Sequence, residues 1–453
     1  MTGTAPGDGP LTAPASADSG QAPGRAALDG NALAAALVPI TGPVSIEGLT
    51  RLSGGASRET WSFDAVGPDG TRTELVLRRD PPGRPSEPGA TAREAAAITA
   101  AAAAGLPVPD VLLIRPDPAA WGGAGMVMRR VSGETIARRI LRDADYAAAR
   151  SALVGDLGRF AAGLHALPAP AAFPAADPLA GLRLTLAGFA DHSPVFELAL
   201  DWLAAHPPPA REPVLVHGDF RLGNLVVGPD GLRAVLDWEL THAGNPAEDL
   251  GWLCVKAWRF GAGPPVAGLG SREDLLAAYR SAGGADVSVD ELHWWEVLGT
   301  LRWGVICMTQ AWAHLAGLLR SVELATIGRR VCEQEWDLLL LLEPDAAERA
   351  AAARPRLSGA GSPSPAPHGR PTASELLEAV REYLLADVMP ATSGQLSFHA
   401  RVAANAVAIV ARELELGREP SDGDLAAQVA ARLAVANPRY FADEDARPGR
   451  PGS

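Results

Sequence analysis

Cysteine and lysine are scarce in this chain of 453 residues, and each scarcity limits what the protein can be. The three cysteines, Cys254, Cys307 and Cys332, show neither a CxxC motif nor paired metal-ligand spacing. This pattern argues against a disulfide scaffold and against a zinc site, and it suits a reducing compartment. Lysine occurs once, as Lys256, so arginine supplies almost all of the 40 basic residues.

The chain also lacks a net positive charge and a long apolar run. The formal net charge of −13 argues against a general nucleic-acid binder and against binding to an anionic membrane surface. The first residues, MTGTAPGDGPLTAPASADSG, have neither the basic start nor the apolar core of a signal peptide. The longest apolar stretch, 95–106, is too short to span a bilayer. We therefore expect a soluble cytoplasmic protein with no nucleic-acid or membrane partner.

Composition divides the chain into segments. Residues 1–28 and 353–372 are rich in Gly, Pro, Ala and Ser, which predicts a disordered tail and a flexible linker. Strand-like patterns with one helix fill 44–131, and helical periodicity dominates 144–353. Beyond the linker, patterns such as SELLEAVREYLL predict amphipathic helices, and the last dozen residues predict a tail. The chain is long enough for two or three domains.

One motif interrupts the helical region, HGDFRLGNLVVGPDGLRAVLDWE at 217–239. The runs 225–227 and 232–236 predict two strands, and Gly-Pro-Asp-Gly between them predicts the turn of a hairpin. Folding the chain there places Asn224 and Asp237 at the same open end, with Asp219 in the loop that leads to it. The sequence therefore predicts a site at which three oxygen-bearing side chains converge.

Four motifs, GGASRETW, LVLRRDPPG, HGDFRLGNL and VLDWELTHAGNPAEDL, occur in an order that resembles the aminoglycoside phosphotransferase-like kinases. The resemblance covers roughly residues 40–345 and is greatest to the branch fused to acyl-CoA dehydrogenases. The separations Asp219–Asn224 and Asn224–Asp237 match those of this family. The resemblance implies an α+β, bilobal protein-kinase-like fold followed by a small all-α domain. The predicted segments are tail 1–28, N-lobe 29–130, C-lobe 131–352, linker 353–372, helical domain 373–440 and tail 441–453.

The family resemblance also implies roles for the hairpin residues. Phosphoryl transfer requires positioning and charge neutralisation, so Asp219 is predicted to accept or orient the hydroxyl proton of the acceptor. Asn224 and Asp237 would supply the oxygen ligands that Mg²⁺ prefers. His217 is predicted to brace the loop. Two further acids have alternatives. Glu239 either tunes the metal or substrate, or is an ordinary exposed acid. Asp249 either braces the loop or is a first-turn acid favoured by the helix dipole.

The nucleotide side shows one departure from the family. Ser53–Ser57 is a glycine-containing turn whose Gly54, Gly55 and Ser57 would cover the ATP phosphates, and Met128 is a further predicted nucleotide contact. Most kinases anchor the phosphates with a lysine paired to a helix glutamate, but this lobe contains no lysine. Arg78 lies at the matching position and Glu94 at that of the acid, so Arg78 would replace the lysine. A pseudokinase that only binds nucleotide is the alternative.

Tryptophan is concentrated in the part of the larger lobe that follows the hairpin, where residues 252–336 contain seven of the eleven in the chain. This density indicates either core packing or an apolar groove for the acceptor. The branch resemblance favours a hydroxyacyl-CoA acceptor, and the alternative is an aminoglycoside or another hydroxylated metabolite. The C-terminal helices show no catalytic cluster, so self-association or partner binding is the predicted role. These seven tryptophans are Trp252, Trp258, Trp294, Trp295, Trp303, Trp312 and Trp336.

Overall fold

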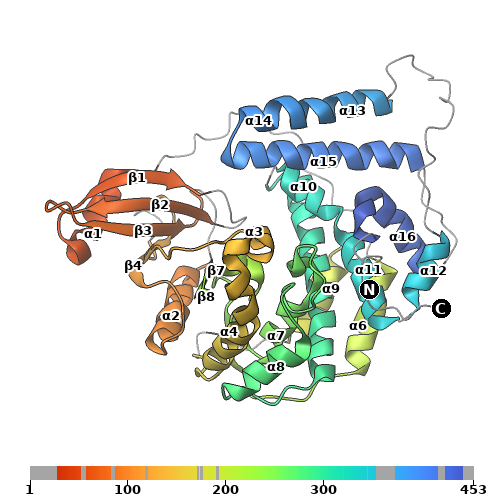
Figure 1. Ribbon diagram of the computed structural model, residues 1–453, viewed down its shortest axis with the longest axis horizontal. Coiled ribbons are helices and arrows are strands. Elements are labelled where there is room, and N and C mark those ends of the chain that lie inside the picture. Colours follow the sequence, from red (N-terminus) through yellow and green to blue (C-terminus); the bar gives the residue numbers. More distant parts are fainter. Residues whose placement is uncertain are drawn as a thin grey trace, which may run out of the picture.

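The structure is a computed structural model. It describes residues 28–52, 58–82, 87–117, 121–170, 173, 177–189, 193–319, 321–343, 345–353, 373–416 and 424–441. Figure 1 shows a sheet-containing lobe beside a larger, mostly helical lobe. The predicted α+β kinase-like fold is thus confirmed. The predicted tails and linker lie outside the described residues, except for Leu28, Ala353 and Phe441.

The small lobe is a five-stranded antiparallel sheet in the order β1-β2-β3-β5-β4, with α1 and α2 packed against it. Alternate residues of a strand face opposite sides of a sheet. On β5, Val127 therefore joins the core under α1, whereas Met126 and Met128 join the core that includes Ile98 of α2. The elements are α1 (Gly30–Thr41), β1 (Ser45–Arg51), β2 (Glu59–Val66), β3 (Arg72–Arg79), α2 (Ala90–Ala103), β4 (Val111–Arg115) and β5 (Gly125–Arg129).

The larger lobe is built around α9, a helix of 27 residues that contacts α6, α7, α10 and α11. Its N-terminus is capped by Ser288, whose hydroxyl accepts from the Glu291 amide. The helices are α3 (Ala137–Arg142), α4 (Ala147–His165), α5 (Pro178–Ala187), α6 (Pro194–Ala205), α7 (Ala247–Cys254), α8 (Arg272–Ser281), α9 (Val289–Leu315), α10 (Val322–Gly328), α11 (Val331–Leu342) and α12 (Ala346–Ala353). Short 3₁₀ turns are η1 (Ala144–Tyr146), η2 (Leu222–Asn224) and η3 (Lys256–Arg259).

Two small antiparallel pairs interrupt these helices. Strand β6 (Val214–Val216) pairs with β9 (His242–Gly244), and β7 (Leu225–Gly228) pairs with β8 (Gly231–Val235). The β7–β8 pair is the hairpin predicted from the sequence, with its second strand shifted by one residue. Each described helix is too short or too polar to traverse a lipid bilayer.

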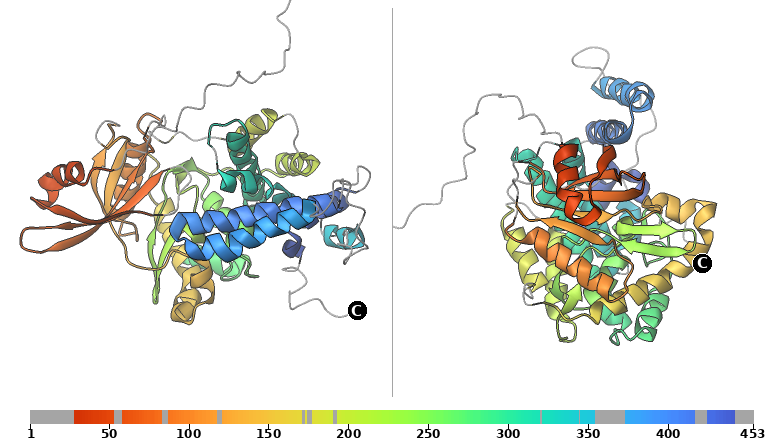
Figure 2. Two further views of the ribbon diagram at one scale, coloured as in Figure 1. Left: turned by 90° about the horizontal axis from the view of Figure 1, so that it is seen from above. Right: turned by 90° about the vertical axis from the view of Figure 1, so that its left-hand side faces the viewer.

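The C-terminal helices follow two different courses. Helices α13 (Ala373–Tyr383) and α15 (Gly394–Leu416) lie side by side, joined by the π-helical turn η4 (Leu384–Val388) and α14 (Met389–Ala391) (Figure 1). Seen from above in Figure 2, this pair runs along the outside of the larger lobe, and α15 contacts α10. Helix α16 (Leu425–Ala436), followed by η5 (Pro438–Phe441), instead packs on α11 and α12.

The packing of α16 differs from the predicted separate domain at 373–440. Its apolar side chains recur at helical spacing, and they belong to the same core cluster as the interior of the larger lobe. An amphipathic pattern specifies that a helix has a face to bury, but not which surface buries it. For this reason the sequence could not separate α16 from α13 and α15. The residues concerned are Ala426, Val429, Ala430 and Leu433.

Candidate active site

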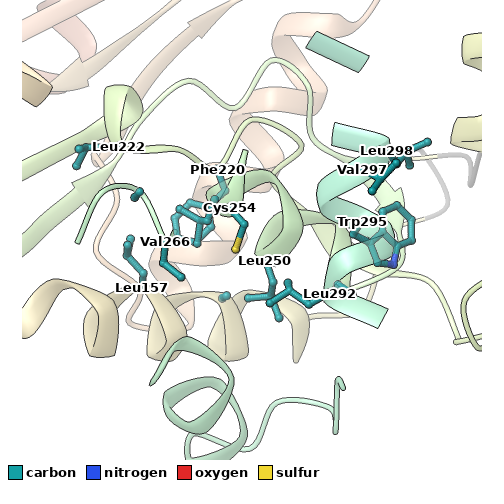
Figure 3. Close-up of a cluster of buried hydrophobic side chains, with 14 of the residues drawn as sticks. Leu157, Phe220, Leu222, Leu250, Cys254, Val266, Leu292, Trp295, Val297 and Leu298 are labelled. Atoms are coloured by element: carbon teal, nitrogen blue, oxygen red, sulfur yellow. The ribbon is translucent and has the colours of Figure 1, made fainter. Parts of the chain in front are cut away.

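The loop between β6 and β7 is fixed by its apolar residues. Phe220 and Leu222 are fully buried, and Figure 3 shows them among side chains of α4, α7 and α9. With these two side chains held in the core, Asp219 and Arg221 face the site. Gly218 has a φ of 79°, and a Cβ there would lie 2.4 Å from the Leu240 carbonyl oxygen. This close approach requires glycine beside the predicted base.

A buried carboxylate anchors the start of this loop. Asp249 accepts hydrogen bonds from the amides of His217 (2.7 Å) and Gly218 (2.9 Å), and His165 Nε2 donates to it at 3.2 Å. Burial alone would raise the pKa of Asp249, but the hydrogen bonds from His165 and from the His217 amide hold it below its usual value. The ring of His217 accepts from the Asp219 amide and contacts the Leu236 carbonyl at 3.0 Å.

Three donors surround the carboxylate of Asp219. Oδ1 accepts from Arg221 Nε at 2.9 Å and from Trp252 Nε1 at 2.8 Å, and Oδ2 accepts from Asn224 Nδ2 at 2.7 Å. The same Asn224 amide nitrogen contacts the Asp219 carbonyl at 2.9 Å. Because Nδ2 of Asn224 is directed at Asp219, its side-chain carbonyl oxygen is the group left to act as a ligand.

Asp237 lies beyond the end of β8, in a left-handed conformation with a φ of 67°. Its Oδ1 is 2.7 Å from Nη2 of Arg78. Burial would raise the pKa of Asp237, but the charge and hydrogen bond of Arg78 bring it below its usual value. The strand has already ended at this point, so strand alternation does not fix the direction of Glu239. Glu239 nevertheless lies 3.7 Å from Arg78.

Glu94 of α2 is almost fully buried and is shared by two arginines. Arg78 Nη1 lies 2.9 Å from Glu94, as the sequence predicted. Arg58 forms the second ion pair with Glu94 and also lies 3.3 Å from Asp80. Burial would lower the pKa of Arg78, but Asp237, Glu94 and Glu239 raise it above its usual value. Arg78 is therefore a permanent cation that links both lobes.

The other predicted nucleotide contacts remain predictions. Gly54, Gly55 and Ser57 lie outside the described residues. Met128 is buried in the core between the sheet and α2, so its contact with a nucleotide remains a prediction. Sequence reasoning missed Arg58, Arg221 and Trp252. Arg58 lies in the quoted motif GGASRETW, and Arg221 lies in HGDFRLGNL, but Trp252 carried no signal beyond its membership of a tryptophan-rich region.

Most tryptophans of the larger lobe are packed in its interior. Trp252, Trp258, Trp294, Trp295 and Trp336 are buried, and Figure 3 shows Trp295 on α9. Trp312 differs from these five, because it is 52 % exposed. Core packing therefore explains most of this tryptophan content. A separate cluster of Trp252, Val255 and Trp258, with Trp303 against it, lies next to Asp219.

The described residues offer a metal ion few protein ligands. No group of three or more His, Cys, Asp or Glu side chains among them is arranged to hold a metal. Asn224 and Asp237 supply one amide oxygen and one anionic carboxylate. Mg²⁺ keeps several waters and is often bound through one or two carboxylates plus substrate phosphates. The donor set therefore fits a site that a nucleotide would complete.

Comparison with known proteins adds three results. The model of the "Phosphotransferase enzyme family" matches residues 48–285, and that of "Domain of unknown function (DUF6285)" matches 390–424. Acyl-CoA dehydrogenase family member 10 of Mus musculus is 31% identical over 195 residues, which are 40% of this chain and 18% of that protein. Acyl-CoA dehydrogenase family member 11 of Gallus gallus is 32% identical over 228 residues, 46% of this chain and 28% of that protein.

This chain thus spans less than a third of the length of these two relatives. Among solved structures, a protein from Ralstonia eutropha assigned to the aminoglycoside phosphotransferases superposes with a TM-score of 0.53 at 22% identity. The superposition covers 70% of this chain and 99% of that one. At this identity the likeness concerns the fold.

Proposed function

Because this chain belongs to the phosphotransferase enzyme family, we propose that it transfers the γ-phosphate of ATP, with Mg²⁺, to a hydroxyl group of a small molecule. The observation that carries the proposal is the convergence of Asp219, Asn224 and Asp237 at one end of the β7–β8 hairpin. Asp219 is hydrogen-bonded to Asn224, and Asp237 is paired with Arg78 of the opposite lobe. An ordinary polar hairpin would not require these contacts among its side chains.

Each residue has a part in the proposed reaction. Asp219 orients the acceptor hydroxyl and takes its proton as the oxygen attacks the γ-phosphorus, and the bond from that phosphorus to the β,γ-bridging oxygen breaks to release ADP. Asn224 and Asp237 would hold Mg²⁺, which would neutralise charge on the phosphates. Asp249 and His217 keep the loop in position through the hydrogen bonds described above. The geometry supports an active enzyme over a pseudokinase, because base and metal-binding groups lie together on a braced loop.

The direct test measures transfer of the γ-phosphate from labelled ATP. Pools of small hydroxylated molecules are incubated with the protein and MgATP, and products are screened by mass spectrometry for the gain of one phosphate. Chelation of Mg²⁺ is expected to abolish the gain. A protein that binds MgATP but phosphorylates no acceptor in any pool would favour the regulatory, pseudokinase alternative.

Arg78 is the proposed phosphate anchor in place of the usual lysine. Its guanidinium lies between Glu94 and Asp237, where a cation can bridge the lobes and contact nucleotide phosphates. Charge-assisted contacts of this kind are worth about 1.5–3 kcal/mol. We therefore expect Arg78→Ala to weaken MgATP binding by about ten-fold to a hundred-fold, measured by calorimetric titration.

Arg129→Ala provides the matched control for Arg78→Ala. Arg129 lies on the neighbouring strand β5, and its side chain is 55% exposed with a long 3.7 Å ion pair to Asp110. Its removal is expected to leave MgATP binding unchanged. Equal affinity of the Arg78→Ala variant and the unmodified protein would show that Arg78 is not the anchor.

For the acceptor we propose a hydroxyacyl-CoA thioester. The proposal is supported by the names of the relatives, which are acyl-CoA dehydrogenase family members. The described acids near Asp219 also argue against a polycationic sugar, because arginines already neutralise them. Asp219 pairs with Arg221, and Glu248 pairs with Arg302 at 2.9 Å. An aminoglycoside site requires carboxylates that are available to the sugar amines.

A chain-length series tests the acceptor class. If the acyl chain is bound in an apolar environment, each buried CH₂ contributes roughly 0.8 kcal/mol, so kcat/KM should rise with chain length among 3- and 4-hydroxyacyl-CoA esters. Steady-state kinetics compares this series with kanamycin-type sugars under the same conditions. Efficient phosphorylation of the sugars without turnover of any thioester would reject the hydroxyacyl class and leave phosphotransfer itself intact.

A further inference from the structure

The indole of Trp252 is hydrogen-bonded to the residue that the proposed function makes the catalytic base. We propose that Trp252 is a positioning residue, which fixes the carboxylate of Asp219 so that Oδ2 is the oxygen that meets the acceptor hydroxyl. The inference rests on the proposed function, but it concerns a residue outside the Asp219, Asn224 and Asp237 set. Trp252 belongs to α7, which packs on α9, and its indole lies beside the loop between β6 and β7.

The hydrogen bonds at Asp219 are divided unequally between its two oxygens. Oδ1 accepts from both Trp252 (2.8 Å) and Arg221 (2.9 Å), whereas Oδ2 accepts only from Asn224 (2.7 Å) among the described residues. A carboxylate has about four acceptor positions, two on each oxygen. Both positions on Oδ1 are therefore taken, and one position on Oδ2 is left for an incoming hydroxyl.

Donors on both oxygens also restrict rotation of the carboxylate. The terminal torsion of an aspartate is broad and nearly two-fold, so nothing within the side chain itself keeps one oxygen forward. Asn224 holds one edge and Trp252 the other. The indole N–H is suited to this task because it donates only and does not titrate, so it cannot compete with the acceptor for the transferred proton.

Trp252 is the more buried of the two donors to Oδ1, since the side chain of Arg221 is 24% exposed. Trp252 itself is 3 % exposed, and its ring packs against Trp258 with a centroid separation of 5.3 Å. The guanidinium of Arg302 lies 5.0 Å from its ring centroid and is held by Glu248. A Cβ at Gly299 would lie 3.2 Å from the Trp252 ring, so the indole rests directly on the backbone of α9.

The test removes the N–H group together with part of the ring volume, and the control below matches the loss of volume. Trp252→Phe keeps an aromatic ring under Arg302 and removes the donor to Asp219. Small displacements of a catalytic group can cost about 10²-fold, so we expect kcat for phosphoryl transfer to fall by about ten-fold to a hundred-fold, with the KM values for ATP and acceptor unchanged. The matched control is Trp294→Phe, another buried indole of this lobe, whose N–H donates to the Leu203 carbonyl.

The control variant should retain the kcat of the unmodified protein. Full kcat in Trp252→Phe, or an equal loss in the two variants, would overturn the inference while leaving the proposed function in place. A second measurement does not depend on turnover. The indole ¹⁵N–¹H resonance of Trp252, assigned by its absence from Trp252→Phe, should shift in Asp219→Asn and not in Asp230→Asn. An unmoved resonance would overturn the inference even if no acceptor were found.

Discussion

Asp219→Asn is expected to lower the rate of phosphoryl transfer by about 10²–10⁴-fold, the usual loss when a positioned general base is removed. The amide is nearly isosteric with the carboxylate but cannot accept the hydroxyl proton. Binding of MgATP should be retained, because the Arg78, Asn224 and Asp237 side chains are unchanged. Single-turnover kinetics gives the transfer rate, and calorimetric titration gives the affinity for MgATP.

Asp230→Asn is the control for this substitution. Asp230 belongs to the turn of the same hairpin, but its side chain is 80% exposed and pairs only loosely with Arg233, at 3.3 Å. The same chemical change at this position should leave the transfer rate unaltered. Undiminished transfer by Asp219→Asn, measured on a genuine acceptor, would refute the assignment of Asp219 as base.

Removal of the chain beyond residue 372 is expected to destabilise the larger lobe severely. The sequence alone predicts the opposite, namely that the kinase region folds without the segments after the linker. The truncation would uncover the surface of α11 and α12 that α16 covers. Complete burial of a Val or Leu side chain contributes about 1.5–3 kcal/mol, against a total stability of about 5–15 kcal/mol.

Polar contacts to α16 and η5 would be lost in the same truncation. The hydroxyl of Tyr440 donates to Asp337 at 2.7 Å, and Arg432 Nη2 lies 2.7 Å from Glu335. Burial raises the pKa of Tyr440 well above its usual value, so its hydroxyl remains a donor. Asp337 and Glu335 are themselves buried, and a buried acid deprived of its partner is costly.

Point substitutions separate this effect from simple shortening of the chain. Leu433 is fully buried on α16, and Leu433→Ala is expected to lower the free energy of unfolding by about 2–5 kcal/mol. Leu414→Ala, at 55% exposure on α15, should have little effect. Urea denaturation provides both values. A truncated protein that unfolds with the midpoint of the full chain would show that α16 adds no stability.

Short-range patterns made the hairpin and the family predictable. Gly-Pro-Asp-Gly between two apolar runs specifies a turn locally, and the spacing of Asp219, Asn224 and Asp237 can be counted directly along the chain. The resemblance to aminoglycoside phosphotransferase-like kinases, including the acyl-CoA dehydrogenase branch, is confirmed by the comparisons. The pairing of Arg78 with Glu94 was also predicted, because the two residues lie at the positions where most kinases have a paired lysine and glutamate.

What the sequence could not supply depends on contacts between distant segments. Asp219 and Trp252 are 33 positions apart, and only the packing of α7 on α9 brings the indole to the carboxylate. Arg58 reaches Glu94 across 36 positions. The left-handed backbone at Asp237, two residues after the end of β8, is uncommon for a residue other than glycine, and the sequence pattern gave no indication of it.

The single lysine of the chain has a practical consequence for experiments. Lys256 Nζ lies 3.1 Å from Asp337 and 4.4 Å from the ring centroid of Tyr440, so its amine is covered by the C-terminal segment. Apart from the terminal amine, an amine-selective reagent has this one target. The rate at which Lys256 is labelled therefore reports how often η5 separates from the larger lobe, and no engineered probe is required. Mass spectrometry can measure this rate in a mixture.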